Sequence, residues 1–264
     1  MTTPKIKTIH KDDSRLYVWD KKEVPGVTSV IGTLPKPFLQ YWAAKVVAEE
    51  AVSTDIPALV NKRGEKGAVQ FLKAAPNRDR DNAADMGSNV HDTLERLALG
   101  ETVDVPTEQQ GFISGYDQFC ERFSPTWLEL EQTVYGESPM GLGYAGSFDA
   151  ITEISGENWL IDFKTTRSGV HPEVALQLAA YANGKSLIHP DGSTSEIPRI
   201  DRFGVLWLRP DEWSFVELNA SQSQDCEMWR TFCSLLEVWH WVNGRSKKAI
   251  GVPQSSGKST PRPF

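Results

Sequence analysis

The sequence predicts an α/β protein in which a helical N-terminal lobe precedes a core of strands and helices. Helical spacing of apolar residues dominates before residue 124, whereas strand-like runs follow Pro125. Another helical segment separates these runs from two further strand-like runs. The 264 residues are 39% apolar and include nine Trp and eleven Phe, which is enough to build a sizeable core.

The first segments predict a hairpin followed by helices. Residues 15–31 alternate apolar and polar residues around Pro25-Gly26, so we expect a small hairpin with its turn there. Residues 37–52 begin at a proline and space apolar residues helically, which predicts an amphipathic helix. Residues 54–82 form either a cationic helical lobe or an ordinary solvated helical face. The basic residues of this last segment are Lys62, Arg63, Lys66, Lys73, Arg78 and Arg80.

Two more helices are predicted over residues 83–99 and 107–123, and Gly100 ends the first of them. His91 and Glu95 lie one turn apart, beside the apolar stripe of the first helix. The stripes are Val90, Leu94, Leu97 and Ala98 in the first helix and Phe112, Tyr116 and Phe119 in the second.

The core is predicted to contain three strands, a helix, two strands and a last helix. Short segments with Gly, Pro or Asn separate the first three strands, so an antiparallel meander is the simplest arrangement. Pro172 stands in the first turn of the helix that follows. In chain order the expected elements are strands 127–135, 143–154 and 158–166, helix 171–188, strands 202–210 and 213–219, and helix 221–242.

These elements divide the chain into three expected parts. Residues 1–124 form the hairpin and helical lobe, and residues 125–244 form the core. Residues 245–264 contain five Lys or Arg, no acidic residue, and many Ser, Pro and Gly, which predicts a disordered basic tail.

Charge and cysteine content exclude several classes of protein. A net charge of −7 and a pI near 5.3 mean that any phosphate binding must come from a local basic patch. The three cysteines lack the spacing of a zinc or iron–sulfur site, so we expect reduced thiols in a cytoplasmic protein without disulfides. The N-terminus has no apolar signal region, and no run is long enough to span a membrane.

Two charges stand inside the apolar strand 158–166. Asp162 and Lys164 are two residues apart and therefore share one face of the strand. Burying either charge alone would cost several kcal/mol, so each needs a partner. A hairpin between strands 143–154 and 158–166 would bring Asp149 close to Asp162. Because a lysine neutralises only one of two carboxylates, the sequence predicts a divalent cation, with Mg²⁺ or Mn²⁺ favoured by oxygen ligands.

Two further residues are candidates with open alternatives. His91 can be a third ligand to the cation, although a lone helical histidine is more often structural or a cap. Glu131 can support the cation or Lys164, or it can simply face solvent. A histidine ligand beside two carboxylates would favour tolerance of manganese.

Taken in order, the strand GSFDAI, the strand IDFKTT and the helix segment QLAAY resemble the RecB-type branch of the PD-(D/E)XK nuclease superfamily. The matching residues are Gly146, Asp149, Asp162, Lys164, Thr165, Gln177 and Tyr181, together with Gly87, His91 and Glu95 of an upstream Gly-x-x-x-His-x-x-x-Glu segment. A looser similarity to phage-encoded and mitochondrial exonucleases begins near residue 24, and members that act in CRISPR adaptation share the upstream histidine. The resemblance covers roughly residues 24–183. The cysteines of iron–sulfur relatives are absent.

This resemblance implies a restriction-endonuclease-like core, in which helices flank a mixed central sheet, and a divalent-metal-dependent deoxyribonuclease activity. It implies Mg²⁺ or Mn²⁺ bound by His91, Asp149, Asp162 and the main-chain carbonyl of Phe163. Lys164 would orient or help to deprotonate the attacking water and stabilise the transition state, unless it only forms a salt bridge with Asp162. Gln177 would belong to the catalytic group by holding Lys164 or touching the DNA backbone, unless it is only a polar edge on a core helix.

The remaining expectations concern DNA. Tyr181 and Thr165 would contact it, unless Tyr181 is an ordinary core residue and Thr165 and Thr166 only end the strand. The helical lobe can form a gate that a strand threads, with Tyr41, Trp42 and Phe71 for stacking, or these aromatics can belong to the core. The gate's phosphate contacts would be Lys45, Lys62, Arg63 and Lys66.

The leading function is therefore a DNA exonuclease of phage or cellular replication, recombination or repair, which acts on single-stranded or duplex DNA with free ends. Its partners can include a recombinase, a helicase or a single-strand-binding protein. A DNA-end-binding accessory with little hydrolysis and a structure-specific endonuclease are the alternatives.

Overall fold

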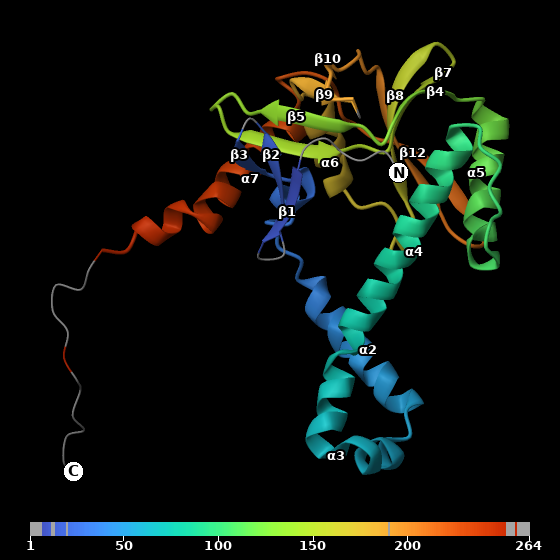
Figure 1. Cartoon of the computed structure of the whole chain (residues 1–264), viewed down its shortest axis with the longest axis vertical. Coiled ribbons are helices and arrows are strands. Elements are labelled where there is room, and N and C mark those ends of the chain that lie inside the picture. The colour runs from blue at the N-terminus through green and yellow to red at the C-terminus, as the bar shows by residue number, and fades with distance from the viewer. Residues whose placement is uncertain (1–6, 12–13, 20, 190, 252–256, 258–264) are drawn as a thin grey trace.

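A computed structural model describes residues 7–11, 14–19, 21–189, 191–251 and 257 (Figure 1). A mixed five-stranded sheet lies at the centre of an α/β core. The strand order is β12-β11-β8-β7-β4, in which β8 and β11 are parallel and the other neighbours are antiparallel. The predicted meander and the two later strands are confirmed. The strands are β4 (Thr126–Leu130), β7 (Ala150–Ile154), β8 (Glu157–Lys164), β11 (Arg202–Leu208) and β12 (Trp213–Glu217).

Helices cover both faces of this sheet. On one face, α5 (Gln110–Phe123) and the C-terminal half of α4 (Ala75–Ala98) pack against Ile161 and Phe163 of β8. On the other face, Leu160 belongs to a core formed with α1 (Val27–Ile31), α6 (Glu173–Ala182) and α7 (Glu227–Asn243). Alternate residues of β8 therefore serve opposite faces, as the sequence predicts.

A second, antiparallel sheet explains two corrections to the predicted strands. Run 127–135 is split into β4 and β5 (Thr133–Glu137), and run 143–154 is split into β6 (Gly143–Ser147) and β7. Both runs leave the central sheet at the same level and enter the sheet β10-β9-β5-β6. The end of predicted helix 171–188 is also wrong, because α6 stops at Ala182. The other strands of the second sheet are β9 (Ser186–Ile188) and β10 (Thr194–Ser195).

The N-terminal hairpin has its turn in a different place from the one predicted. Strands β2 (Ser14–Trp19) and β3 (Lys22–Pro25) pair with each other, and Lys21 between them has a positive φ of 63°. Pro25 ends β3, and α1 follows Gly26 directly, so Pro25-Gly26 is a strand-to-helix junction. A further strand, β1 (Lys7–Lys11), adds to β2.

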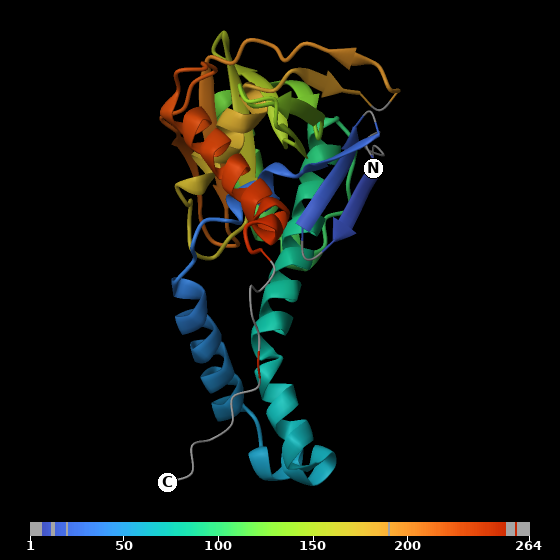
Figure 2. The ribbon, with the colours of Figure 1, turned by 90° about the vertical axis from the view of Figure 1, so that its left-hand side faces the viewer.

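Three helices form an arm that projects from the core (Figures 1 and 2). The chain leaves the core along α2 (Phe38–Ser53), turns through α3 (Ile56–Lys73) and returns along α4. The predicted helix 37–52 is confirmed, but its apolar residues are not buried. Tyr41, for example, is 72% exposed. Predicted helix 83–99 is the core-facing half of the longer α4.

The C-terminal part differs from its prediction at both ends. Helix α7 begins at Glu227 rather than at residue 221 and ends before Gly244. A short 3₁₀ helix, Arg245–Lys248, follows at the start of the predicted disordered tail, and residues 252–256 and 258–264 of that tail lie outside the described residues. A second 3₁₀ helix, Thr107–Gln109, leads into α5.

The three cysteines, Cys120, Cys226 and Cys233, are free thiols. Within the described ranges, no helix has both the length and the apolar character that crossing a membrane requires.

Candidate active site

The bend between the two sheets places two carboxylates side by side. The chain bends at Glu131, which has a positive φ of 48°, and at Phe148-Asp149 on the neighbouring run. Backbone hydrogen bonds hold the bends together: the N–H of Glu131 donates to the carbonyl of Asp149 at 2.9 Å, and the N–H of Phe148 donates to the carbonyl of Gln132 at 3.1 Å. Asp149 therefore lies between two strands rather than within one. Its side chain does not have to point to one face of a sheet, as it would in a regular strand.

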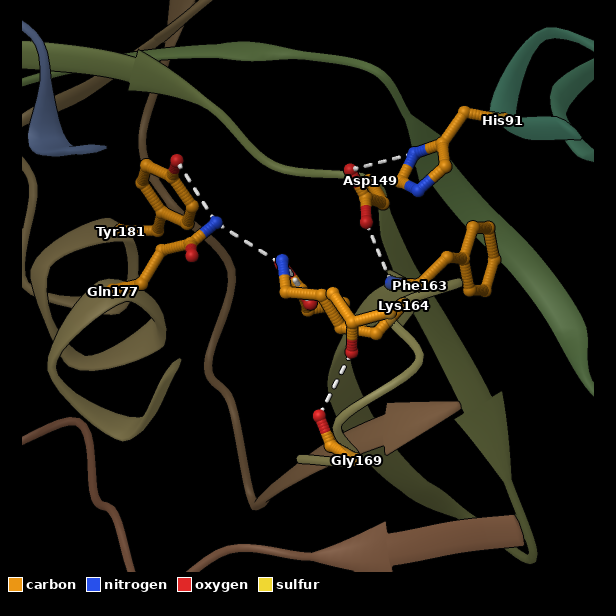
Figure 3. Close-up of polar contacts among 9 residues, drawn as sticks. His91, Asp149, Phe163, Lys164, Gly169, Gln177 and Tyr181 are labelled. Carbon is orange, nitrogen blue, oxygen red and sulfur yellow. Dashed lines mark hydrogen bonds and ion pairs between the residues drawn. The ribbon is translucent and has the colours of Figure 1, made fainter. Parts of the chain in front are cut away.

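Helix α4 brings His91 to these carboxylates. Gly87, one turn earlier, lies against the end of β8, where an added Cβ would stand 3.2 Å from Oγ1 of Thr165. The absence of a side chain at Gly87 lets α4 approach the strand closely. Nδ1 of His91 lies 3.6 Å from Oδ1 of Asp149, and Oδ2 of Asp149 accepts a 2.6 Å hydrogen bond from the N–H of Phe163 (Figure 3).

His91, Glu131 and Asp149 form a group that can hold a metal ion. Each offers one ligand atom, and these atoms lie within 4.8 Å of one another. Two ligand atoms on opposite sides of a small divalent cation lie about 4–4.5 Å apart. The three side chains would therefore need to move only slightly toward one another to bind such a cation. Two carboxylate oxygens suit Mn²⁺ and Mg²⁺, and the added imidazole nitrogen favours Mn²⁺ of the two. Of the two alternatives left open for Glu131, this geometry favours support of a cation.

Asp162 has a different environment from the one predicted. Its side chain is 2% exposed, and Nζ of Lys164 lies 2.8 Å from Oδ1 and 2.7 Å from Oδ2. Gln177 of α6 donates a 3.0 Å hydrogen bond to the same Oδ1. Asp162 is expected from the sequence to bind the metal, but among the described residues it lies outside the 4.8 Å group and forms an ion pair with Lys164.

The pKa values of His91, Glu131 and Asp149 are shifted because these ionisable side chains lie close together and are half-buried. Burial alone would lower the pKa of His91, but Asp149, Asp162 and Glu131 raise it to about 9. Burial, and then the charge of Asp149, raises the pKa of Glu131 to about 8. Burial also raises the pKa of Asp149, but the adjacent His91 outweighs it and lowers that pKa overall. Such perturbed groups cluster at functional sites.

The ion pair of Lys164 keeps it charged. Burial would lower the pKa of Lys164, but the carboxylates of Asp162 and Asp149 outweigh burial and raise it. Burial, offset in part by Lys164, raises the pKa of Asp162 to about 6. An ammonium that is protonated at neutral pH can stabilise negative charge, but it is a poor base, so the orienting role expected of Lys164 fits better than deprotonation of water.

Tyr181 is buried in the core next to Gln177 and is not exposed at the surface of the protein. It is 3% exposed, and its hydroxyl lies 3.4 Å from Nε2 of Gln177. Gly146 makes room for its ring, because an added Cβ there would approach the ring to 2.7 Å. The expectation that Tyr181 contacts DNA does not match this burial. Tyr181 contacts Gln177, which lies next to Lys164 in Figure 3 and donates its hydrogen bond to Asp162.

The threonines and Phe163 have mainly structural contacts. Thr165 is half-buried beside Gly87, and Oγ1 of exposed Thr166 donates to the carbonyl of Gly169 at 2.8 Å, which closes the loop after β8. The ring of Phe163 is buried, and its N–H holds Asp149. Thr165 directly follows the last residue of β8.

The arm presents some of the residues expected of a gate. Tyr41 is exposed and Trp42 is half-buried, whereas Phe71 lies under the guanidinium groups of Arg63 and Arg78, 5.0 and 4.2 Å from its ring centre. Phe71 is half-buried and packs against these two arginines within the arm. The basic residues Lys45, Lys62, Arg63 and Lys66 are exposed, and Lys45 pairs with Glu49 at 3.6 Å.

Comparison with known proteins adds little to this geometry. No protein-family model matches the chain, and no curated protein matches it. The chain is similar to a solved structure described as "Crystal structure of SSO0001", at 14% sequence identity and a TM-score of 0.36 over 78% of this chain and 87% of that one. A likeness of this size carries no argument about function.

Proposed function

We propose that this chain is a divalent-metal-dependent DNA exonuclease. The observation that carries the proposal is the convergence of His91, Glu131 and Asp149 within 4.8 Å, from a helix and two strand bends, beside the ion pair of Asp162 and Lys164. The order of Gly146, Asp149, Asp162, Lys164 and Gln177 supports placing the chain in the RecB-type branch of the PD-(D/E)XK nucleases, with a restriction-endonuclease-like core.

The donor set fits Mn²⁺ or Mg²⁺, which His91, Glu131 and Asp149 would hold. Asp162 and the carbonyl of Phe163 stay candidates on the resemblance alone. When bound, such an ion neutralises charge on a phosphate and lowers the pKa of a coordinated water. His91 is carried by α4, and backbone hydrogen bonds between the two bends hold Glu131 and Asp149, so the three residues already lie close together without an ion.

Lys164 supplies the second positive charge. Its ammonium is anchored by Asp162, and a quarter of its side chain (25%) is exposed, so it can reach a phosphate without leaving its partner. There it stabilises the negative charge that grows as the phosphodiester bond breaks. Gln177 fixes the Asp162 carboxylate from the other side, and Tyr181 fixes Gln177.

The arm favours an exonuclease over an endonuclease. Helix α4 carries His91 in its core half and forms one side of the arm with its other half, so the arm begins next to the site. Exposed Lys62, Arg63 and Lys66 give α3 a basic surface that attracts phosphates. A strand that has to pass the arm to reach His91 needs a free end. The binding-module alternative is less favoured, because it needs no cluster of ligands.

The test is hydrolysis of linear and circular single-stranded DNA of equal length, and of linear duplex, with and without Mn²⁺. We expect wild-type protein to degrade linear DNA only when Mn²⁺ or Mg²⁺ is present, and to spare circles. Cleavage of circles at the rate of linear strands would indicate an endonuclease. DNA binding without hydrolysis in either metal would favour the end-binding accessory and contradict the enzyme assignment.

A further inference from the structure

Arg209 stands on the same face of the central sheet as the catalytic lysine. The parallel pairing of β8 and β11 puts Trp207 beside Lys164. Side chains two residues apart in an extended chain point to the same face, so Arg209 lies on the same face as Trp207. Trp207 packs against the α6-side core, whereas Leu208 belongs to the opposite core, which agrees with this assignment. Arg209 therefore lies just past the carboxyl ends of two parallel strands, where α/β folds commonly bind ligands.

The guanidinium of Arg209 is held in position by the loop after β8. Its Nη1 lies 3.4 Å from the carbonyl oxygen of Thr166, and the same oxygen accepts a 2.8 Å hydrogen bond from the indole N–H of Trp207. The guanidinium carbon also lies 5.9 Å from the centre of the Trp207 ring. Thr166 is two residues beyond Lys164, so Arg209 is anchored to the segment that directly follows the lysine.

Within the part of the chain that the structure describes, the charge of Arg209 has no counterion. Among the described residues, no carboxylate lies within 4.0 Å of it, and its Nε is buried without a hydrogen-bond partner. The neighbouring cations differ, since Lys164 pairs with Asp162 and Arg167 pairs with Asp79 at 2.9 Å. A cation that is partly removed from water and lacks a partner is unfavourable by itself. An anionic ligand at this strand end would compensate it.

We propose that Arg209 binds a backbone phosphate of the DNA strand next to the phosphate that is cleaved. The inference rests on the proposed nuclease function and adds a positioning residue to it. A guanidinium suits this role because its fork of N–H donors matches two oxygens of a phosphate. Because its anchor, Thr166, lies two residues past Lys164, Arg209 is assigned to a phosphate that flanks the one that is cleaved.

Steady-state hydrolysis of a linear oligonucleotide by Arg209→Ala, Arg209→Lys and wild type tests this role. Losing a charge-assisted contact that is present in both ground and transition states should raise KM about tenfold or more and leave kcat nearly unchanged. Arg209→Lys should lie between the two. Arg167→Ala, which removes an exposed arginine that already has a partner, is the matched control and should keep the wild-type KM. An unchanged KM in Arg209→Ala would overturn the inference.

A second readout does not depend on hydrolysis. Equilibrium DNA binding is measured by fluorescence anisotropy at several salt concentrations without a divalent ion. Losing one phosphate contact should reduce the slope of log K against log salt by about one in Arg209→Ala and not in Arg167→Ala. If wild type hydrolyses no DNA, the proposed function fails while this comparison still tests Arg209. Equal slopes in wild type and Arg209→Ala would overturn the phosphate contact even in an active nuclease.

Discussion

Asp149→Asn should abolish hydrolysis, with kcat reduced by about 10³-fold or more. The substitution keeps the shape of the side chain but removes the charge that faces His91 and lies beside Glu131. A bound divalent ion contributes several kcal/mol to the transition state, and each 1.36 kcal/mol is a factor of ten in rate. The measurement is the rate of release of an end label from linear DNA in Mn²⁺.

Asp225→Asn is the matched control, because it changes an exposed aspartate outside the site. It should keep the wild-type rate. Circular dichroism and thermal unfolding would establish that Asp149→Asn is folded. A folded Asp149→Asn protein that degrades DNA at more than a tenth of the wild-type rate would remove Asp149 from the proposed centre.

Lys164→Ala should lower kcat by about 10²–10³-fold, which is the usual effect of removing one preorganised group that stabilises transition-state charge. Metal affinity should change much less, because Lys164 is not one of the three clustered ligand residues. The two readouts together separate loss of transition-state stabilisation from loss of the ion. Single-turnover cleavage and Mn²⁺ titration of the same preparation provide them.

Removing Lys164 also leaves Asp162 buried without its ion pair, which can destabilise the fold by about 3–5 kcal/mol. Lys164→Arg keeps a cation next to Asp162, so it should unfold near the wild-type midpoint and have intermediate activity. Lys185→Ala, which removes the lysine of an exposed ion pair with Glu137, should behave as wild type. Wild-type turnover by Lys164→Ala would contradict a role for this lysine.

Much of the α/β core can be predicted from the sequence, because the spacing of apolar residues changes at clear boundaries between helices and strands. The meander through β7 and β8 follows from period-two runs, and the helices α5, α6 and α7 follow from apolar stripes. The sequence does not show that two of the predicted runs are divided between two sheets. Apolar and polar residues alternate in the same way in the strands before and after each bend. The second sheet begins where Thr133 of β5 pairs with Ile188 of β9, and this pairing is a tertiary feature.

The sequence also predicts His91, Asp149 and Lys164 as site residues, and the structure places His91 beside Asp149 and Lys164 beside Asp162. Tyr181, which the sequence predicts to contact DNA, is buried. Proximity of Asp149 to Asp162 follows from the hairpin register, in which Ala150 pairs with Ile161. The bend at Phe148-Asp149 turns Asp149 toward His91 of α4, whereas Asp162 faces Lys164. This bend depends on tertiary contacts, so the local sequence does not show it. Glu131 joins the site for the same reason, because its place at the bend is set by hydrogen bonding to the neighbouring run.

The arm shows a different limit of sequence reasoning. Helical spacing predicts that an apolar stripe is buried, and it correctly identifies α2 as a helix. It cannot show that α2 leaves the core, so that Phe38 and Tyr41 stay exposed. An exposed apolar and basic arm beside the site is what the proposed exonuclease would use.

The central claim is that His91, Glu131 and Asp149 bind one divalent ion, and Mn²⁺ binding tests it most directly. Electron paramagnetic resonance of free Mn²⁺ measures binding without DNA or turnover. We expect saturable binding by wild type that tightens from pH 6.5 to pH 8.5, because His91, with a pKa of about 9, and Glu131, with a pKa of about 8, must lose their protons to bind a metal.

His91→Ala, Glu131→Gln and Asp149→Asn should each weaken Mn²⁺ binding at least about tenfold, since each removes one ligand. Asp225→Asn should bind as wild type does. Folded variants of all three ligand residues that bind Mn²⁺ with the wild-type affinity would contradict the account.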